Sequence, residues 1–255
     1  SINTMKKKET GIIFQIQHFS VNDGEGIRST IFMSGCPLRC KWCCNPESWD
    51  MNPGKYAKKM TVDEVLKEIK RQMIFYRYSN GGITYSGGEP TCQAEFLRNL
   101  VYIFYDMGIH QTIETGGYFN WDNLVDIFEK LDFIFIDIKH MDGEIHRRYT
   151  GCNNNIILDN IANIGKLNKE TVIRIPLIKD INDSEQNITK IAQFISKNIP
   201  SAKIEVLPYH SLGNYKYDNL GLSKYKNLYA TPDEKDIEKV KDIIKGFAIE
   251  VIDFK

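Results

Sequence analysis

Extended and helical segments alternate along almost the whole chain, and this alternation limits the possible folds more than any other feature. Strands are predicted where β-branched and aromatic residues gather, at Ser29–Met33, Ile83–Ser86, Gln111–Glu114, Phe133–Ile138, Thr171–Ile175 and Lys203–Leu207. Since a helical pattern follows each of them, parallel pairing through right-handed crossovers is expected. The sequence therefore predicts an α/β fold, a partial (β/α)6 TIM-like barrel with a parallel sheet. Two more strands, Gly11–Ile16 and Ala248–Ile252, are expected to cover its edges.

The helices follow from apolar residues at helical spacing and from end signals. They are predicted at residues 62–73, Cys92–Met107, Trp121–Lys130, Ile156–Leu167, Asp183–Asn198 and Thr231–Lys245. A Thr61–Glu64 capping box starts the first, and Thr231, Pro232 and Glu234 are expected to start the last. No repeat or long linker divides the chain, so residues 1–255 are expected to form a single domain, with an irregular stretch from Pro208 to Ala230.

Composition excludes several classes of protein. The 255 residues are 42% hydrophobic and 26% charged, which is ordinary for a folded protein. Because 33 basic residues balance 33 acidic ones, a general nucleic-acid binder is not expected. No apolar run approaches the roughly 20 residues of a membrane helix. The apolar run Ile12–Phe14 is too short for a secretion signal, so a cytoplasmic location is expected. Residues 1–4 precede Met5 and are expected to be a cloning remnant.

Three cysteines, Cys36, Cys40 and Cys43, lie within eight residues just after the first predicted strand. Such closely spaced thiolates can bind one metal centre if the loop wraps around it. A structural zinc site would need a fourth ligand from Cys44, Cys92, Cys152 or a histidine, and a redox thiol pair is a further alternative. Cys44 adjoins Cys43, so its side chain is expected to point away from the same centre. Three ligands on a four-iron cluster would leave one iron open to a molecule that is not protein.

The other polar signals follow the remaining predicted strands. They are Tyr85–Pro90, Glu114–Gly117, Asp137 with Lys139, Arg174 within its strand, and Pro208–His210. The carboxyl ends of parallel strands meet at one edge of a sheet, where this architecture places active sites. The paired glycines Gly87 and Gly88 allow close backbone approach to a ligand, and carbonyls together with Glu89 suit a protonated amine. Donors for a carboxylate or for ribose hydroxyls come from Lys139, Arg174 and His210.

The cysteine triplet, with Trp42 before its last cysteine, resembles the hallmark of the radical S-adenosylmethionine superfamily. A narrower resemblance covers nearly the whole chain and is to glycyl radical enzyme activating enzymes of the pyruvate formate-lyase activating type. It rests on Asp23–Arg28, Asn45–Trp49, Asp137–Asp142, Arg174–Pro176, Asn182–Glu185 and Leu207–Gly213.

This resemblance implies roles for individual residues. Cys36, Cys40 and Cys43 would hold a 4Fe–4S cluster, and Trp42 would pack beside the adenine of S-adenosylmethionine. The cofactor contacts it implies are at Ser86, Gly87, Gly88, Glu89, Glu114, Lys139, Arg174 and His210. It also implies that Glu114, Thr115 and Asp137 surround a monovalent cation, Na+ or K+, although Glu114 is longer than the aspartate of the family pattern.

The activity implied is radical transfer to a protein. A reduced cluster would cleave S-adenosylmethionine to methionine and a 5′-deoxyadenosyl radical, which would take a hydrogen from a glycine α-carbon of a partner glycyl radical enzyme. An electron donor such as flavodoxin or ferredoxin is a second implied partner. Asp23, Arg28 and the Tyr209–Tyr229 segment, Tyr209 above all, are candidates for guiding the partner's glycine loop, with ordinary packing of the tyrosines as the alternative.

Two other functions stay open at the level of sequence. One is a radical S-adenosylmethionine enzyme acting on a small molecule, similar to 7-carboxy-7-deazaguanine synthase. The other is a non-catalytic zinc-binding module. No ferredoxin-like insert with auxiliary clusters is expected, because only Cys44–Met60 separates the triplet from the first long helix. Buried, apolar surroundings are expected for Cys44, Cys92 and Cys152.

Overall fold

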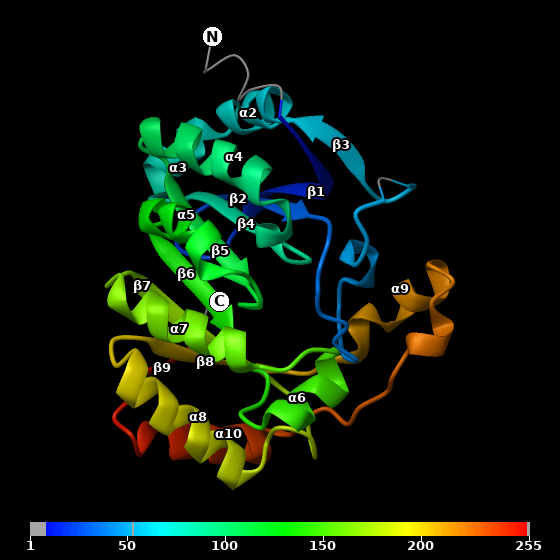
Figure 1. Ribbon diagram of the computed structural model, residues 1–255, viewed down its shortest axis with the longest axis vertical. Coiled ribbons are helices and arrows are strands. Elements are labelled where there is room, and N and C mark those ends of the chain that lie inside the picture. The colour runs from blue at the N-terminus through cyan, green and yellow to red at the C-terminus, as the bar shows by residue number, and fades with distance from the viewer. Residues whose placement is uncertain (1–8, 53, 254–255) are drawn as a thin grey trace.

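Nine strands form one sheet in the computed structural model, which describes residues 9–52 and 54–253 (Figure 1). The strands are β1 (Thr10–Ser20), β2 (Arg28–Met33), β3 (Lys58–Thr61), β4 (Gly82–Gly87), β5 (His110–Thr115), β6 (Phe133–Asp137), β7 (Glu170–Leu177), β8 (Lys203–Pro208) and β9 (Val251–Ile252). They lie in the order β3-β1-β2-β4-β5-β6-β7-β8-β9. All neighbours from β2 to β9 are parallel, whereas β1 is antiparallel to β2 and β3. The expected incomplete parallel barrel is confirmed.

Helices occupy most of the connections between the strands. They are α2 (Val62–Lys70), α3 (Met73–Ser79), α4 (Ala94–Asp106), α5 (Val125–Lys130), α6 (Gly143–Thr150), α7 (Asn155–Lys166), α8 (Glu185–Asn198), α9 (Asn214–Asn219) and α10 (Glu234–Lys245). In Figure 1, α3, α4, α5 and α7 lie along the left of the sheet, whereas α9 and the segment that follows β2 lie on the right. Within the described ranges, no helix has the length and apolar character needed to cross a bilayer.

The two faces of the central strands differ in chemistry. On β4, Ile83 and Tyr85 belong to the large apolar core that lies between the sheet and the helices. The alternate residues Thr84 and Ser86 form hydrogen bonds on the inner face of the barrel, as side chains one residue apart must face opposite ways. The inner face has a small apolar cluster of its own, around Phe135. The curved sheet therefore has an apolar outside and a largely polar inside.

Several sequence predictions were wrong in detail. The N-terminal strand is not an edge, because β3, which was not predicted, pairs with it on the outside. The first helix ends at Lys70, and Met73 begins the separate helix α3. The stretch Pro208–Ala230 contains α9 and two turns of 3₁₀ helix, Ser211–Gly213 and Ser223–Tyr225. The expectation about residues 1–4 and Met5 lies outside the described residues.

The helix-start signals were correct at one helix and misplaced at another. At α2 the predicted capping box is present, with Thr61 Oγ1 accepting from the Glu64 amide and the Glu64 carboxylate accepting from the Thr61 amide. At α10 the capping box is formed instead by Asp233 and Asp236, two residues after the predicted cap at Thr231. Aspartate caps as well as threonine does, and Asp236 gains a second partner in Lys179 at 2.6 Å.

Candidate active site

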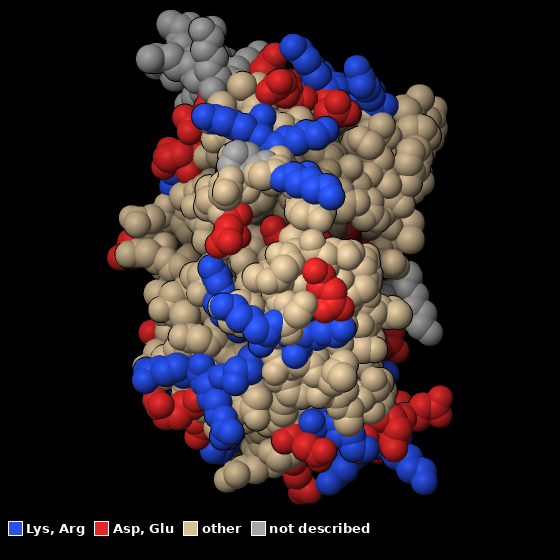
Figure 2. Space-filling model, turned by 90° about the vertical axis from the view of Figure 1, so that its right-hand side faces the viewer, with Lys and Arg blue, Asp and Glu red and all other residues tan. Residues whose placement is uncertain are grey.

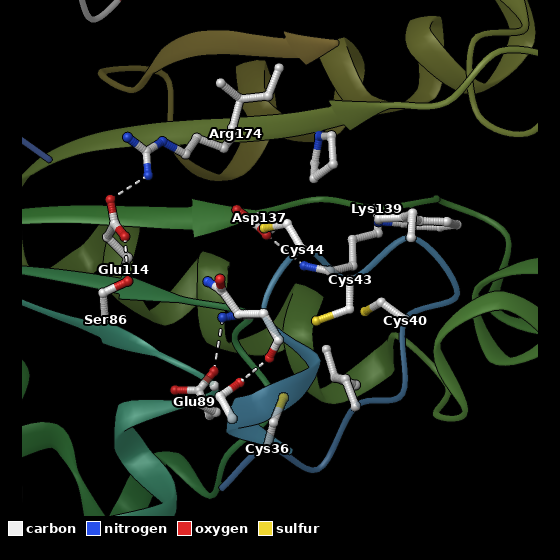
Figure 3. Close-up of a pocket in the computed structure, with 18 of the residues that line it drawn as sticks. Cys36, Cys40, Cys43, Cys44, Ser86, Glu89, Glu114, Asp137, Lys139 and Arg174 are labelled. Carbon is white, nitrogen blue, oxygen red and sulfur yellow. Dashed lines mark hydrogen bonds and ion pairs between the residues drawn. The ribbon is translucent and has the colours of Figure 1, made fainter. Parts of the chain in front are cut away.

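A cavity of about 320 Å³ opens at the carboxyl ends of the parallel strands (Figure 3). This is within the usual size of small-molecule sites. The predicted site residues that line it are Cys36, Cys40, Trp42, Cys43, Ser86, Gly87, Gly88, Glu89, Glu114, Thr115, Asp137, Lys139, Arg174, Tyr209 and His210. Of the predicted residues, only Asp23 and Arg28 do not line it. The fold thus brings distant segments of the chain to one place.

The cysteine loop is held in position by its backbone. Gly35 donates its amide hydrogen to the Ser48 carbonyl at 2.7 Å, and Cys36 donates to Trp49 at 3.3 Å. Further along, Arg39 donates to Thr150 at 2.7 Å, at the end of α6. Because no cysteine side chain takes part in these bonds, the thiols are left to face the cavity. In Figure 3 the sulfur atoms of Cys36, Cys40 and Cys43 point into the same space.

Burial keeps these thiols protonated in the absence of a metal. It raises the pKa of Cys36 to about 12 and that of Cys40 to about 11, and it raises the pKa of Cys43 as well. Within the described residues, no three His, Cys, Asp or Glu side chains are placed so that they could bind one metal ion together. A cuboidal cluster binds each thiolate to a different iron, so its ligands need not converge on one point. The three thiols around one cavity fit a cluster better than a single zinc ion.

The paired glycines of β4 are needed where the strand meets the cysteine loop. Gly87 has φ +119°, and a Cβ on it would lie 2.3 Å from the Met33 carbonyl oxygen. A Cβ on Gly88 would lie 2.4 Å from the Gly35 carbonyl oxygen. The Gly88 amide donates to Met33 at 2.9 Å. The glycines therefore let the end of β4 pack against the backbone that carries the cysteines.

The Glu89 carboxylate was predicted to bind an amine, but it already accepts hydrogen bonds from other residues of the protein. It accepts from the Thr91 hydroxyl at 2.8 Å, from the Thr115 hydroxyl at 2.8 and 2.9 Å, and from the Gly116 amide at 2.8 Å. Burial raises the pKa of Glu89, while these donors lower it. Glu89 therefore joins the end of β4 to the end of β5, as a positioning residue.

A buried ion-pair network crosses the barrel interior. Arg174 on β7 donates to Glu114 on β5 at 2.5 Å and to Glu205 on β8 at 2.7 Å. Its guanidinium also lies 3.6 Å from the centre of the Phe135 ring. Glu114 in addition accepts from the Ser86 hydroxyl at 2.5 Å. Burial lowers the pKa of Arg174, but the two carboxylates raise it by more, so the arginine stays charged.

Lys139 brings a second cation to the cavity. Its Nζ lies 2.6 Å from the Asp137 carboxylate. Burial lowers the pKa of Lys139 and the adjacent Asp137 carboxylate raises it, and the net shift is upward. The backbone of Lys139 is held by Asn182, whose side chain donates to its carbonyl at 2.9 Å. A fixed positive charge therefore lies beside the thiols.

Aromatic side chains form the remaining wall and the rim. The Trp42 ring lies 5.9 Å from that of Tyr149 and 6.3 Å from that of Tyr229. Tyr209 is buried with its ring 5.6 Å from that of Tyr229. His210 follows it and is exposed. Flat apolar surface next to exposed donors suits a ligand with one apolar and one polar end.

The three cysteines outside the triplet are not buried as predicted. Cys44 and Cys92 are exposed and Cys152 is half-buried. Cys44 also lines the cavity, because the turn after Cys43 continues along the cavity wall instead of entering the apolar core. All three described thiols are free.

Arg28 does not face a partner protein, contrary to the sequence prediction. It is fully buried, and it donates to the Thr84 hydroxyl at 2.7 Å, to the Ile83 carbonyl at 2.6 Å and to the Glu25 carbonyl at 3.0 Å. Burial lowers its pKa to about 10, with Asp23 opposing the shift. Arg28 therefore holds the 23–28 loop against the amino-terminal end of β4.

This structural role predicts the effect of Arg28→Lys. Lysine keeps the charge but cannot reproduce the planar set of donors, so unfolding should become easier by about 2 kcal/mol. Urea unfolding of the purified protein measures the change. The matched control is Arg71→Lys at an exposed position, which should leave stability within about 0.5 kcal/mol of the parent. An unchanged midpoint for Arg28→Lys would show that its hydrogen bonds contribute no net stability.

Three site residues were missed by sequence reasoning. Glu205 on β8 lies beside Arg174 on β7 and faces the same side of the sheet. The alternation of side chains along β8 could have predicted this inward position. Asn182 was noted only as part of a family pattern, and it ties the ends of β6 and β7 together through Lys139 and Pro176. Tyr217 donates its hydroxyl to the Cys43 carbonyl at 2.9 Å from the distant helix α9. No local signal marks that contact.

Comparisons with known proteins identify the family of the chain. The family model of the radical SAM superfamily matches residues 30–192. The chain is 36% identical to the 4-hydroxyphenylacetate decarboxylase activating enzyme of Clostridioides difficile (strain 630), over 93% of this chain and 94% of that protein. It is 37% identical to the pyruvate formate-lyase-activating enzyme of Clostridium pasteurianum, over 88% and 93%.

A solved structure shows the same likeness. A domain of a pyruvate-formate lyase-activating enzyme from Bacteroides vulgatus ATCC 8482 is 28% identical, with a TM-score of 0.55, and the match covers 68% of this chain and 98% of that one. The curated relatives match most of the length of the chain, and the solved structure shares its fold. The chain therefore belongs to the radical S-adenosylmethionine superfamily and, within it, to the glycyl radical enzyme activating enzymes.

Proposed function

We propose that Cys36, Cys40 and Cys43 each bind one iron of a 4Fe–4S cluster, and that S-adenosylmethionine occupies the cavity beside it. The chain would then form a glycyl radical in a partner enzyme. The observation that carries this assignment is that the three thiols share one cavity with the ends of β4, β5, β6 and β7. The cluster and S-adenosylmethionine, when bound, supply the one-electron chemistry that removes a hydrogen atom from the glycine α-carbon.

The chain's own residues bind and orient the cofactor. Trp42 offers a flat surface for the adenine, and Lys139, Arg174 and the exposed His210 offer donors for carboxylate and hydroxyl oxygens. Since the Glu89 carboxylate is already occupied, the backbone carbonyls of Ser86 to Gly88 are left to accept from the amino group. The buried walls exclude water, which protects a reactive radical from side reactions.

The proposed monovalent cation fits this arrangement poorly. The carboxylates that Na+ or K+ would need already have cationic partners, because Glu114 pairs with Arg174 and the Oδ2 atom of Asp137 pairs with Lys139. The Thr115 hydroxyl donates to Glu89. Arg174 and Lys139 thus neutralise the carboxylates that a cation would otherwise neutralise. We assign no cation and derive no step through one.

The partner's glycine loop needs a path to the cavity. Asn22 accepts from Arg174 through its carbonyl at 3.5 Å, so the 21–24 loop lies next to the inner face of the barrel. Asp23 beside it is half-buried and accepts from the hydroxyls of Ser20 and Thr30. Asp23 and Tyr209 remain our candidates for contact with that loop. A cytoplasmic location would supply both the reductant and the reduced thiols.

The test is anaerobic reconstitution with iron and sulfide, reduction by dithionite and addition of S-adenosylmethionine. We expect about four irons per chain and release of methionine and 5′-deoxyadenosine. Purified 4-hydroxyphenylacetate decarboxylase, pyruvate formate-lyase and isethionate sulfite-lyase would be offered as partners. Electron paramagnetic resonance should detect a glycyl radical in at least one of them. Cleavage without a radical in any of the three would favour a small-molecule substrate, and one zinc per chain without cleavage would contradict the proposal.

A further inference from the structure

A group of basic side chains lies on the outer surface of the cysteine loop and is not used by the site described above. It consists of Arg39 and Lys41 on the loop and Arg147 and Arg148 on α6, all of them exposed. We call these four residues the basic collar. Figure 2 views the side of the molecule on which this loop and α6 lie, and Lys and Arg side chains gather across its middle and lower left.

Backbone and ring contacts hold the collar together. Lys41 donates its amide hydrogen to the Tyr149 carbonyl at 2.9 Å, which joins the loop to the end of α6. The Lys41 ammonium lies 5.3 Å, and the Arg148 guanidinium 5.7 Å, from the centre of the same Tyr149 ring. Two cations on one aromatic ring are therefore kept close to each other at the surface.

The collar carries uncompensated positive charge. Arg39 has Asp50 at 3.7 Å and Arg147 has Glu144 at 3.5 Å, both at exposed positions. Among the described residues, Lys41 and Arg148 have no carboxylate within ion-pair distance. Because the chain as a whole has a net charge of zero, this positive charge is local. An acidic surface would be attracted to this face specifically.

The position of the collar relates it to the cluster. Lys41 directly follows Cys40 and is separated from Cys43 only by Trp42. A molecule that touches Lys41 is therefore one residue from one proposed cluster ligand and two from another. The ring of Trp42 lines the cavity and lies 5.9 Å from that of Tyr149, so the collar lies next to the proposed cluster site. Electron transfer becomes steeply slower with distance, which favours a carrier that binds at this surface. The cavity wall at Leu207–His210 is formed by a different part of the chain.

We infer that the basic collar is the docking surface for a small acidic protein that carries one electron to the cluster. This rests on the proposed function. In the step, the carrier is oxidised by one electron and the cluster is reduced by one electron, and no bond forms or breaks. Charge complementarity would bring the carrier to the collar, and the ring of Tyr149 and the edge of Trp42 would supply the apolar contact.

The test compares the parent protein with Lys41→Glu/Arg148→Glu and with Arg148→Glu alone, all with the cluster reconstituted. The probes are a purified flavodoxin and a purified ferredoxin, both acidic. Binding is measured by calorimetry, and cluster reduction by stopped-flow absorbance. At low salt we expect the double substitution to lower the second-order rate constant for reduction by about tenfold or more. The difference should shrink as added salt screens the charges.

Two controls make the result specific. Lys235→Glu reverses an exposed charge in the first turn of α10, and it should bind and be reduced like the parent. Reduction by dithionite and the following cleavage of S-adenosylmethionine should be unchanged in every variant, so a failure of the proposed function would be visible separately.

The inference is overturned if neither carrier binds the parent protein, or if the double variant binds and is reduced as the parent is. If the double variant also loses dithionite-driven cleavage, its cysteine loop has been disturbed, and the single variant Arg148→Glu is used instead. Arg148 lies on α6, so this substitution leaves the sequence of the cysteine loop unchanged. An unchanged rate constant in that variant overturns the inference, and a reduced one that recovers at high salt supports it.

Discussion

Replacing Cys36, Cys40 or Cys43 by alanine, one at a time, is expected to abolish the cleavage of S-adenosylmethionine while leaving the fold in place. Each thiol is assigned to a different iron, so none can substitute for another. The loop itself is held by backbone hydrogen bonds, such as that from Gly35 to Ser48. Removing a sulfur atom therefore breaks none of the backbone hydrogen bonds that hold the loop in place. Losing a residue that only hydrogen-bonds to a metal ligand costs about 10- to 100-fold in activity, and losing the ligand itself should cost more. Release of 5′-deoxyadenosine, measured by chromatography, should therefore fall by more than about a hundredfold.

Two cysteines outside the triplet provide matched controls for this prediction. Cys92→Ala, at an exposed position, should keep the iron content and the activity of the parent. Cys44→Ala tests the three-ligand assignment more sharply, because Cys44 lines the same cavity. Loss of the cluster in Cys44→Ala would mean that four side chains bind the metal centre. No iron would then be open to S-adenosylmethionine, and the proposed chemistry would fail.

Arg174→Ala is expected to make the protein about 3–5 kcal/mol easier to unfold, the usual cost of removing one partner from a buried ion pair. The substitution leaves the Glu114 and Glu205 carboxylates, 18% and 5% exposed, without their shared cation. Urea unfolding at neutral pH measures the loss. Arg98 also bridges two carboxylates, but at the surface, where Glu95 is 74% and Asp126 is 34% exposed. Arg98→Ala should therefore cost only about 1 kcal/mol.

The pH dependence of the Arg174→Ala variant has a definite sign. Burial raises the pKa of Glu114, and Arg174 opposes this in the parent protein. Without Arg174 the pKa of Glu114 in the folded state lies above that in the unfolded state, so proton binding favours the folded state. The stability lost at neutral pH should return in part as the pH falls toward about 5. Equal losses at both pH values would show that the cost is one of packing and not of charge.

The strands and long helices were predictable because their signals are local. The six predicted strands of the sheet agree with β2, β4, β5, β6, β7 and β8 to within two residues at either end, since a buried parallel strand reads as a short run of β-branched and aromatic residues. Helices α3, α6 and α9 were missed. All three are short, and a short helix depends on tertiary contacts for its stability. For α9 one such contact is the Tyr217 hydroxyl on the cysteine loop.

The sequence predicted which residues line the site, but not which of their side chains pair with one another. The residues that follow the strands meet in one cavity because carboxyl ends of parallel strands lie at one edge. Which carboxylate meets which cation depends on side-chain reach across the barrel, and no local pattern reports it. The sequence therefore predicted that Glu89 binds a ligand, although its carboxylate accepts hydrogen bonds from Thr91, Thr115 and Gly116. It likewise predicted that Arg28 contacts a partner, although that side chain is fully buried.

The amino-acid sequence by itself determined the strand and helix alternation, the cysteine spacing and the family, because each of these is carried by residues close together in the chain. The tertiary structure alone decided that Arg174 lies between Glu114 and Glu205, and that Lys41 and Arg148 share the face of Tyr149. These pairs join residues from separate strands and loops. Their geometry depends on the curvature of the sheet and on the packing of α6 against the cysteine loop, which become defined only when the chain has folded.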